Sequence, residues 1–379
     1  MIAVDFSTVQ KERQAEFRAF VDQDIMPYAA QIDQEECIPK AIIEKMVAKG
    51  YWGADLPREF GGSDMDLITA GLLHQEIGRG CSNVRNLIGV QGMVSSAILK
   101  WGTETQKRHW LPKMASGEVT TAFALTEPDV GSDIRNLQTE AVLEGSDYIL
   151  NGAKKWITFG GSADLYIVFA KCQGRIGAFL VERNTPGFIT TPIKGLLGFR
   201  GSMLAELTFE DCRIPAENVL SRIGFGLSHV ANYGLSHGRY STAWGCVGLA
   251  QACLESSVHY AAERQQGEKL LKDHQLIQEM IADMETNITC ARLLCLHASY
   301  LRENNDERFV METAKAKYFA SRTAFNAANA AVQIHGANGC GSEYPVQRYL
   351  RDAKIMEIVE GSSQVQQIII AAHAFRKKY

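Results

Sequence analysis

One glutamate near the C-terminus has neighbours that could make it a catalytic base. Glu360 follows an apolar helical repeat at 355–359 and precedes a break that starts at Gly361. Ser363 and Gln366, three residues apart, predict a capping box that opens a second helix. Glu360 is therefore expected at a helix C-terminus, where the macrodipole disfavours an anion by about 0.3–1 kcal/mol. The local pattern alone favours a solvated glutamate, and a base held on a loop is the alternative.

Two stretches in the middle of the chain carry groups that suit a flat ring. In FALTEPDVGSD, 123–133, proline and glycine are spaced as in a turn that exposes amides and hydroxyls. Such a loop can donate to an acceptor-rich ring, although an ordinary turn is the simpler interpretation. In KKWITFGG, 154–161, Trp156 and Thr158 alternate on an expected strand and so share a face. They could flank a heteroaromatic ligand, and a core tryptophan is an equally good interpretation.

Two further stretches lie in the C-terminal third. Arg264 and Gln275 could hold a pyrophosphate or a ribityl chain through charge-assisted hydrogen bonds, or could belong to a helix cap. In QIHGANG, 333–339, Gly336 and Gly339 permit close approach of the backbone to a ligand, or simply a tight turn. Each of these stretches, taken singly, is ambiguous.

The composition and the missing motifs exclude several classes of protein. The 379 residues carry a net charge of −4 with scattered basic residues, which gives no reason to expect a nucleic-acid partner. Nine cysteines without a C-x-x-C pair, and histidines without H-E-x-x-H spacing, predict no disulfide framework and no metal. No apolar stretch approaches 18 residues and no signal peptide is recognisable, so a cytoplasmic protein is expected. Rossmann, P-loop and G-x-S-x-G motifs are absent.

The elements that must position these residues fall into three parts. Residues 1–117 have helical periodicity with glycine stops, which predicts a helical domain. Residues 118–225 contain short β-branched and aromatic runs between turn residues, which predict an antiparallel β domain. Residues 226–379 return to long helical patterns that are apolar on more than one face, as in a helical bundle with subunit contacts.

The chain resembles the acyl-CoA dehydrogenase family over essentially its whole length. Five stretches carry the resemblance in the family's order, namely ALTEPDVGSD, KKWITFGG, FEDCRIPAENVL, the 264–275 segment and YLRDAKIMEIVEGSSQVQ. The resemblance implies a helical domain, a β domain and a C-terminal four-helix bundle, assembled as a homotetramer or homodimer. It also implies FAD bound without a Rossmann motif.

The resemblance assigns roles to individual residues. Glu360 falls on the family's catalytic base, which would remove the α-proton of an acyl thioester while the β-hydride passes to flavin N5. Residues similar to the family's substrate contacts are Ser132, Arg239 and Gly361. Residues similar to its FAD contacts are Phe123, Leu125, Thr126, Gly131, Ser132, Trp156, Thr158, Ser362 and Gln364, and, toward a neighbouring subunit's FAD, Arg264, Gln333 and Gly336.

Two positions bear on this assignment. Gly267-Glu268 stands where the family usually has Phe-Gly, which removes an aromatic contact to FAD and leaves a non-catalytic scaffold subunit as an alternative. Some relatives carry the base on the long helix beside the Arg239 position. Gly238 occupies that place here, which favours Glu360.

A narrower resemblance concerns the substrate. GRYSTAWGCVGLAQAC and DAKIMEIVEGSS resemble the branch that oxidises small polar acyl groups on carrier proteins for polyketide and nonribosomal-peptide extender units. Val359 stands where many fatty-acyl members have tyrosine. An acyl group on an acyl carrier protein is therefore expected, with an ordinary short-chain acyl-CoA as the alternative. The electron acceptor, an electron-transfer flavoprotein or oxygen, stays open.

Overall fold

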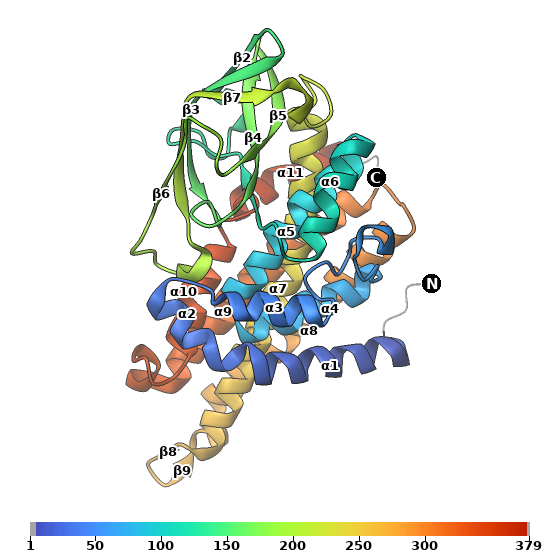
Figure 1. Cartoon of the computed structure of the whole chain (residues 1–379). Helices are drawn as coiled ribbons and strands as arrows, with labels where there is room; N and C mark the ends of the chain where they lie inside the picture. Colours follow the sequence, from blue (N-terminus) through green and yellow to red (C-terminus); the bar gives the residue numbers. More distant parts are fainter. Residues whose placement is uncertain (1–4, 377–379) are drawn as a thin grey trace.

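The computed structural model describes residues 5–376 and begins with a helical part (Figure 1). Ser7 caps its first helix with a capping box, and Thr103 does the same for its last one. Helices α4 and α5 are buried along most of their length, so they form the centre of the molecule. The helices of this part are α1 (Thr8–Asp24), α2 (Ala29–Glu35), α3 (Lys40–Ala48), α4 (Leu67–Gly80), α5 (Ser82–Trp101) and α6 (Glu104–Ala115).

A curled seven-stranded sheet follows, drawn at the top of Figure 1. Its strands are β1 (Thr121–Ala124), β2 (Glu140–Glu144), β3 (Asp147–Ile157), β4 (Leu165–Cys172), β5 (Arg175–Glu182), β6 (Phe188–Pro192) and β7 (Ala205–Pro215). The order is β1-β4-β2-β3-β7-β6, with β5 also paired to β4. The prediction of a wholly antiparallel sheet is wrong, because both β1 and β2 pair with β4 in parallel. Strand pairing joins segments distant in sequence, and short apolar runs do not encode it.

Long helices make up the C-terminal part. They are α7 (Asn232–Glu263), α8 (Gln275–Glu303), α9 (Phe309–His335), α10 (Val346–Met356) and α11 (Ser363–Arg376). Helix α7 packs against α4 with almost no space between the backbones, since a Cβ on Gly248 would lie 1.9 Å from the carbonyl oxygen of Gln75. A small hairpin of β8 (Gln265–Gln266) and β9 (Lys269–Leu270) projects beyond the far end of α7 (Figure 1). The predicted fold class, helical then β then helical, is confirmed.

Within residues 5–376, no helix is both long enough and apolar enough to cross a membrane. The same residues contain no group of three or more His, Cys, Asp or Glu side chains placed to hold a metal ion.

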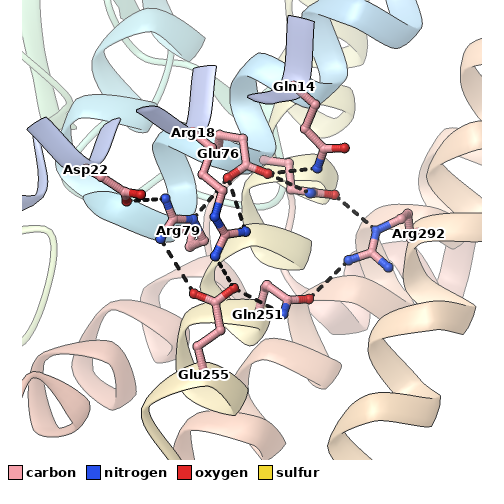
Figure 2. A network of polar contacts seen from close by, with 9 residues as sticks. Gln14, Arg18, Asp22, Glu76, Arg79, Gln251, Glu255 and Arg292 are labelled. Carbon is pink, nitrogen blue, oxygen red and sulfur yellow. Dashed lines mark hydrogen bonds and ion pairs between the residues drawn. The ribbon is translucent and has the colours of Figure 1, made fainter. Parts of the chain in front are cut away.

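A buried polar network ties α1, α4, α7 and α8 together (Figure 2). Its centre is Glu76, 1% exposed, which accepts from Gln14 at 2.8 Å and from the Arg79 Nε at 3.0 Å. Arg79 also pairs with Asp22 and Glu255. The remaining members are Arg18, Gln75, Gln251 and Arg292. Arg79 pairs with three carboxylates, of which only that of Glu76 is buried, so removal of the Glu76 charge leaves the buried Arg79 with two partly exposed partners.

We therefore expect Glu76→Gln to lower the free energy of unfolding by about 3 kcal/mol. Urea denaturation followed by circular dichroism measures this change. The matched control is Glu104→Gln, which removes an exposed carboxylate paired with Lys107 and should leave the midpoint unchanged. Equal midpoints for the two variants would contradict a structural role for the network.

Candidate active site

A cavity of about 500 Å³ lies where the β domain meets α5, α7 and the turn between α10 and α11. Eleven of the fifteen site residues singled out from the sequence line it. They are Phe123, Leu125, Thr126, Gly131, Ser132, Trp156, Thr158, Arg239, Glu360, Gly361 and Ser362. The fold thus places residues from three separate sequence motifs around one cavity.

The turn that carries Glu360 is tighter than the sequence pattern suggested. Helix α10 ends at Met356, four residues before Glu360, which has a left-handed backbone with φ of 58°. Ser363 is already the first residue of α11, and the hydroxyl of Ser362 accepts from the N–H of Val365. The predicted helix end and the predicted capping box at Ser363 are therefore each misplaced. A non-glycine residue in this conformation is strained, and such strain is common at functional sites.

One oxygen of the Glu360 carboxyl group is buried without a hydrogen-bond partner. This oxygen, Oε2, is unpaired within the described part of the chain. Gly238 makes room for it, because a Cβ at that position would lie 2.4 Å from Oε2. Burial raises the pKa of Glu360, and the positive charges of Arg239, Lys317 and Arg85 partly oppose that rise. The group is thus a stronger base than an exposed glutamate.

Three side chains from three helices fix the backbone around Glu360. The Nε of Arg239 on α7 donates to the carbonyl of Glu360 at 3.1 Å. Gln366 on α11 donates to the carbonyls of Glu360 and Gly361, each at 3.2 Å. The buried Lys317 on α9 donates to the carbonyl of Gly361 at 2.8 Å, and burial lowers its pKa to about 8. These bonds hold both carbonyl groups in the left-handed turn.

A buried ion pair supports the loop on the opposite wall. Lys154 on β3 lies 2.7 Å from Glu127, and both side chains are almost fully buried. Glu127 also accepts from the N–H and the hydroxyl of Thr139. Burial alone would raise the pKa of Glu127, but the bonds from Lys154 and Thr139 outweigh it and the pKa is lowered. The pair anchors the loop that presents Gly131 and Ser132 to the cavity.

Trp156 reaches the cavity by a route that the strand pattern did not predict. The register of β3 against β7 shifts between Lys154 and Ile157, and Trp156 itself has φ of 62°. Thr158 lies just beyond the end of the strand. Trp156 and Thr158 therefore do not lie on one face of a regular strand, as the alternating pattern predicted. The irregularity leaves the Trp156 side chain 53% exposed at the cavity wall.

The same walls carry free hydrogen-bond donors. The backbone N–H groups of Thr126 and Thr158 donate to no protein oxygen in residues 5–376. The N–H of Glu360 is equally without a protein partner in that range. Donors of this kind, beside an exposed indole, suit a flat ligand rich in acceptor atoms.

Four of the predicted contacts do not line this cavity, namely Arg264, Gln333, Gly336 and Gln364. Arg264 lies 26 residues beyond Gly238 along α7, about 40 Å at 1.5 Å per residue. It therefore cannot contact a ligand in the cavity of its own chain. Gln333, Gly336 and Gln364 are exposed.

Comparison with known proteins decides the family. Residues 7–118, 122–212 and 226–375 match the N-terminal, middle and C-terminal domains of acyl-CoA dehydrogenase. Human mitochondrial short-chain specific acyl-CoA dehydrogenase is 38% identical, over 95% of this chain and 88% of the relative. The chain belongs to the acyl-CoA dehydrogenase family. It is a flavin-dependent oxidoreductase that acts on CH–CH bonds, as the resemblance implied.

Other acyl-CoA dehydrogenase relatives differ in what their names say of the substrate. Acryloyl-CoA reductase (NADH) of Anaerotignum propionicum is 36% identical over 100% of this chain and 98% of the relative. Butyryl-CoA dehydrogenase of Megasphaera elsdenii superposes with a TM-score of 0.94 at 34% identity, covering 98% and 99% of the two chains. The prolyl acyl carrier protein oxidase AnaB gives a TM-score of 0.93 at 28% identity, covering 98% and 100%. FkbI, for biosynthesis of a methoxymalonyl extender unit, gives 0.88 at 31% identity, covering 97% and 100%.

The cofactor of this acyl-CoA dehydrogenase is FAD, and the site fits it. The unpaired N–H groups of Thr126 and Thr158 suit the acceptor-rich edge of an isoalloxazine ring, and Trp156 offers an exposed aromatic face. These residues would hold the ring against the wall that faces Glu360.

Sequence reasoning missed several residues of the site. Asn86, Val90 and Met93 of α5 line the cavity but resemble ordinary core positions of a buried helix. Lys317 lies in an alanine-rich helix where a lysine is normally solvated. A lysine within an otherwise apolar helical stripe was the only available signal.

Replacement of Lys317 tests its action on the base. We expect Lys317→Met to lower kcat about three- to tenfold, because one buried hydrogen bond to the turn is lost. Its positive charge also lowers the pKa of Glu360, so its removal should move the acid limb of the pH–rate profile to higher pH.

The matched control is Lys317→Arg, which keeps the charge and a donor and should restore most of the profile. An unchanged acid limb in Lys317→Met, with normal FAD content, would show that the lysine is merely structural.

Proposed function

We propose that the protein oxidises a small acyl thioester, with Glu360 as the base that removes the α-proton. The observation that carries this proposal is the buried, unpaired Oε2 of Glu360 at the wall of the cavity. An exposed glutamate is too weak a base for this proton. Burial raises the pKa of Glu360 toward the working pH, which is the range in which general bases are effective.

The thioester oxygen needs donors as negative charge develops on it. The unpaired backbone N–H of Glu360 is such a donor, and its orientation is fixed by the bonds from Arg239, Gln366 and Lys317 to the same turn. FAD, when bound, supplies the N5 acceptor for the β-hydride and a ribityl hydroxyl as a second donor. Glu360 and its N–H thus act on the α-carbon and on the adjacent carbonyl of one substrate.

The acyl group is proposed to arrive on an acyl carrier protein. The similarity to AnaB and FkbI and the small Val359 at the cavity wall support this substrate. A free short-chain acyl-CoA is the alternative, favoured by the human relative. Either thioester offers the same α-carbon to Glu360, so only the group that carries the acyl chain differs.

The protein is further proposed to act as a homotetramer or homodimer. Arg264 lies too far along α7 to serve its own cavity, as expected of a residue that contacts the FAD of another subunit. Gly267-Glu268 forms the turn of the projecting β8–β9 hairpin, with φ of 62° at Gly267. The segment thus has a regular hairpin conformation without the family's phenylalanine, and Arg264 and Gln275 flank it.

Anaerobic bleaching of the flavin tests the base. The purified protein should be yellow and should bleach on addition of a short acyl thioester, while Glu360→Gln should stay yellow and react about 10²- to 10⁴-fold more slowly. The wild-type rate should rise with pH through a pKa above the ordinary value of glutamate, because the ionised carboxylate is the reactive form.

Bleaching of Glu360→Gln at the wild-type rate would remove Glu360 from the catalytic role. A protein that binds no flavin would support the scaffold alternative instead.

The carrier is tested by offering the same acyl groups on CoA and on a phosphopantetheinylated carrier protein. We expect the carrier-bound form to bleach the flavin with kcat/KM at least about tenfold higher, since specificity is the ratio of these constants. The unacylated carrier protein is the control. Equal or faster bleaching by acyl-CoA would return the protein to ordinary acyl-CoA oxidation.

A further inference from the structure

One loop of the β domain reaches the helix that precedes the Glu360 turn. The loop 193–203 joins β6 to β7 and packs on α10, where a Cβ on Gly198 would lie 2.4 Å from the carbonyl oxygen of Arg351. The two backbones are therefore in direct contact, and any side chain at position 198 would separate them. The contact connects the β domain with the same segment of chain that carries Glu360.

Two consecutive residues of α10 bind this loop. The Nη1 of Arg351 donates to the carbonyl of Leu197 at 3.0 Å, and the same guanidinium pairs with Asp33 on α2. The carboxylate of Asp352 accepts from the N–H of Phe199 at 2.8 Å. The loop is thus held through one of its carbonyl groups and one of its N–H groups.

Asp352 is an unusual group to bury at such a contact. It is 2% exposed, it forms no ion pair among residues 5–376, and the bond from Phe199 is the only side-chain hydrogen bond that it makes in that range. Burial raises the pKa of Asp352 to about 6, and the N–H of Phe199 is the main influence that opposes this rise. A buried acid with a single bond costs free energy relative to an apolar residue, so the bond calls for an explanation.

Phe199 depends on the same bond. Its backbone is left-handed with φ of 52°, a conformation that costs a non-glycine residue on the order of 1–3 kcal/mol. Its N–H donates to no backbone carbonyl in residues 5–376. Its ring is buried, and the ring centroid lies 5.9 Å from Cζ of Arg85 on α5. Loss of the Asp352 acceptor would leave a buried N–H without a partner and allow the strained residue to relax.

The other end of the loop is bonded to the wall of the cavity. The carbonyl of Ser202 accepts from the N–H of Phe159 at 2.8 Å, and Phe159 directly follows Thr158, which lines the cavity. The hydroxyl of Ser202 accepts from Asn86 at 3.1 Å, and Asn86 also lines the cavity. The loop therefore links α10 to the wall that carries Trp156 and Thr158.

We propose that Asp352 is a positioning residue for Glu360, which acts through Phe199 to fix the spacing between the Glu360 turn and the wall that holds the flavin ring. This inference rests on the proposed function, in which the α-carbon of the substrate lies beside Glu360 and the β-carbon lies beside that ring. A displacement of about 1 Å between reacting groups costs on the order of 10² in rate. None of residues 193–203 lines the cavity, so a shift of the loop lowers the rate more than the affinity.

The test compares two replacements of Asp352 that differ in the hydrogen bond. Asp352→Asn keeps an oxygen acceptor for the N–H of Phe199 and should retain the rate of flavin reduction to within about threefold. Asp352→Leu has a similar volume but no acceptor, and should lower that rate on the order of 10- to 100-fold.

Rate and affinity are measured separately. Anaerobic bleaching at a series of concentrations of butyryl thioesters, on CoA and on the carrier protein, gives the limiting rate of flavin reduction. Spectral titration of the same variants with Glu360→Gln added gives Kd without turnover. We expect Kd to change by less than about threefold, because the groups that contact the substrate are kept.

Two further variants support the comparison. Gly198→Ala places a methyl group against the carbonyl of Arg351 and so displaces the loop while Asp352 is kept. It should lower the limiting rate with the same unchanged Kd, and it decides the question if Asp352→Leu fails to fold. Glu303→Met is the matched control, because the Glu303 carboxylate on α8 accepts from the N–H of Ile68 at 3.3 Å, away from the cavity. It should lower the melting temperature without changing the limiting rate.

The outcomes separate the two proposals. An unchanged limiting rate in folded Asp352→Leu or Gly198→Ala with full FAD content would overturn the positioning role. An equal loss of rate in Asp352→Asn and Asp352→Leu, or a larger change in Kd than in rate, would overturn it as well. No reaction of the wild-type protein with any thioester would instead overturn the proposed function, on which the role of Asp352 rests.

Discussion

The site depends on one short turn whose backbone would not be stable alone. Glu360 has φ of 58° and Gly361 has φ of 86°, so two consecutive residues are left-handed and their carbonyl groups accept no bond of a regular helix. Side chains from α7, α9 and α11 donate to these carbonyls. The turn is therefore held by its own following helix, α11, and by two helices distant in sequence, α7 and α9, that must pack against it. Placement of Glu360 is therefore a property of the packed helices rather than of its own segment alone.

The helices that form this site pack closely, and such packing requires small residues where the helices cross. Backbone contact between α4, α5 and α7 is possible because glycines occupy the crossing points, as at Gly248 against Gln75. The polar network around Glu76 and Arg79 joins α4 and α7 to α1 and α8 through buried ion pairs and hydrogen bonds. The contrast with Arg85 is informative: one buried arginine is fully paired within the protein, and the other is left with free donors.

Some residues of this site are recognisable from the local sequence, and others are defined only by tertiary contacts. The turn motifs at 123–133 and 355–364 contain proline, glycine and hydroxyl residues whose local meaning is strong, and most of their predicted contacts line the cavity. Lys317 and Arg85 lie inside regular helices, where local pattern does not distinguish a buried charge from a solvated one. The register shift before Trp156 and the parallel pairing of β1 with β4 arise from tertiary pairing, which alternation along one strand does not contain.

Gly238 also constrains which residues can replace one another at this site during evolution. The volume that a side chain at position 238 would fill is the volume that the Glu360 carboxyl already occupies, with only 2.4 Å between the two. Only one of the two positions can therefore place a carboxylate at this point of the cavity. A lineage that moved the base from one to the other would need a small residue at the vacated position. Sequence change at 238 and 360 is accordingly expected to be epistatic, because position 238 cannot take a larger side chain while Glu360 is kept.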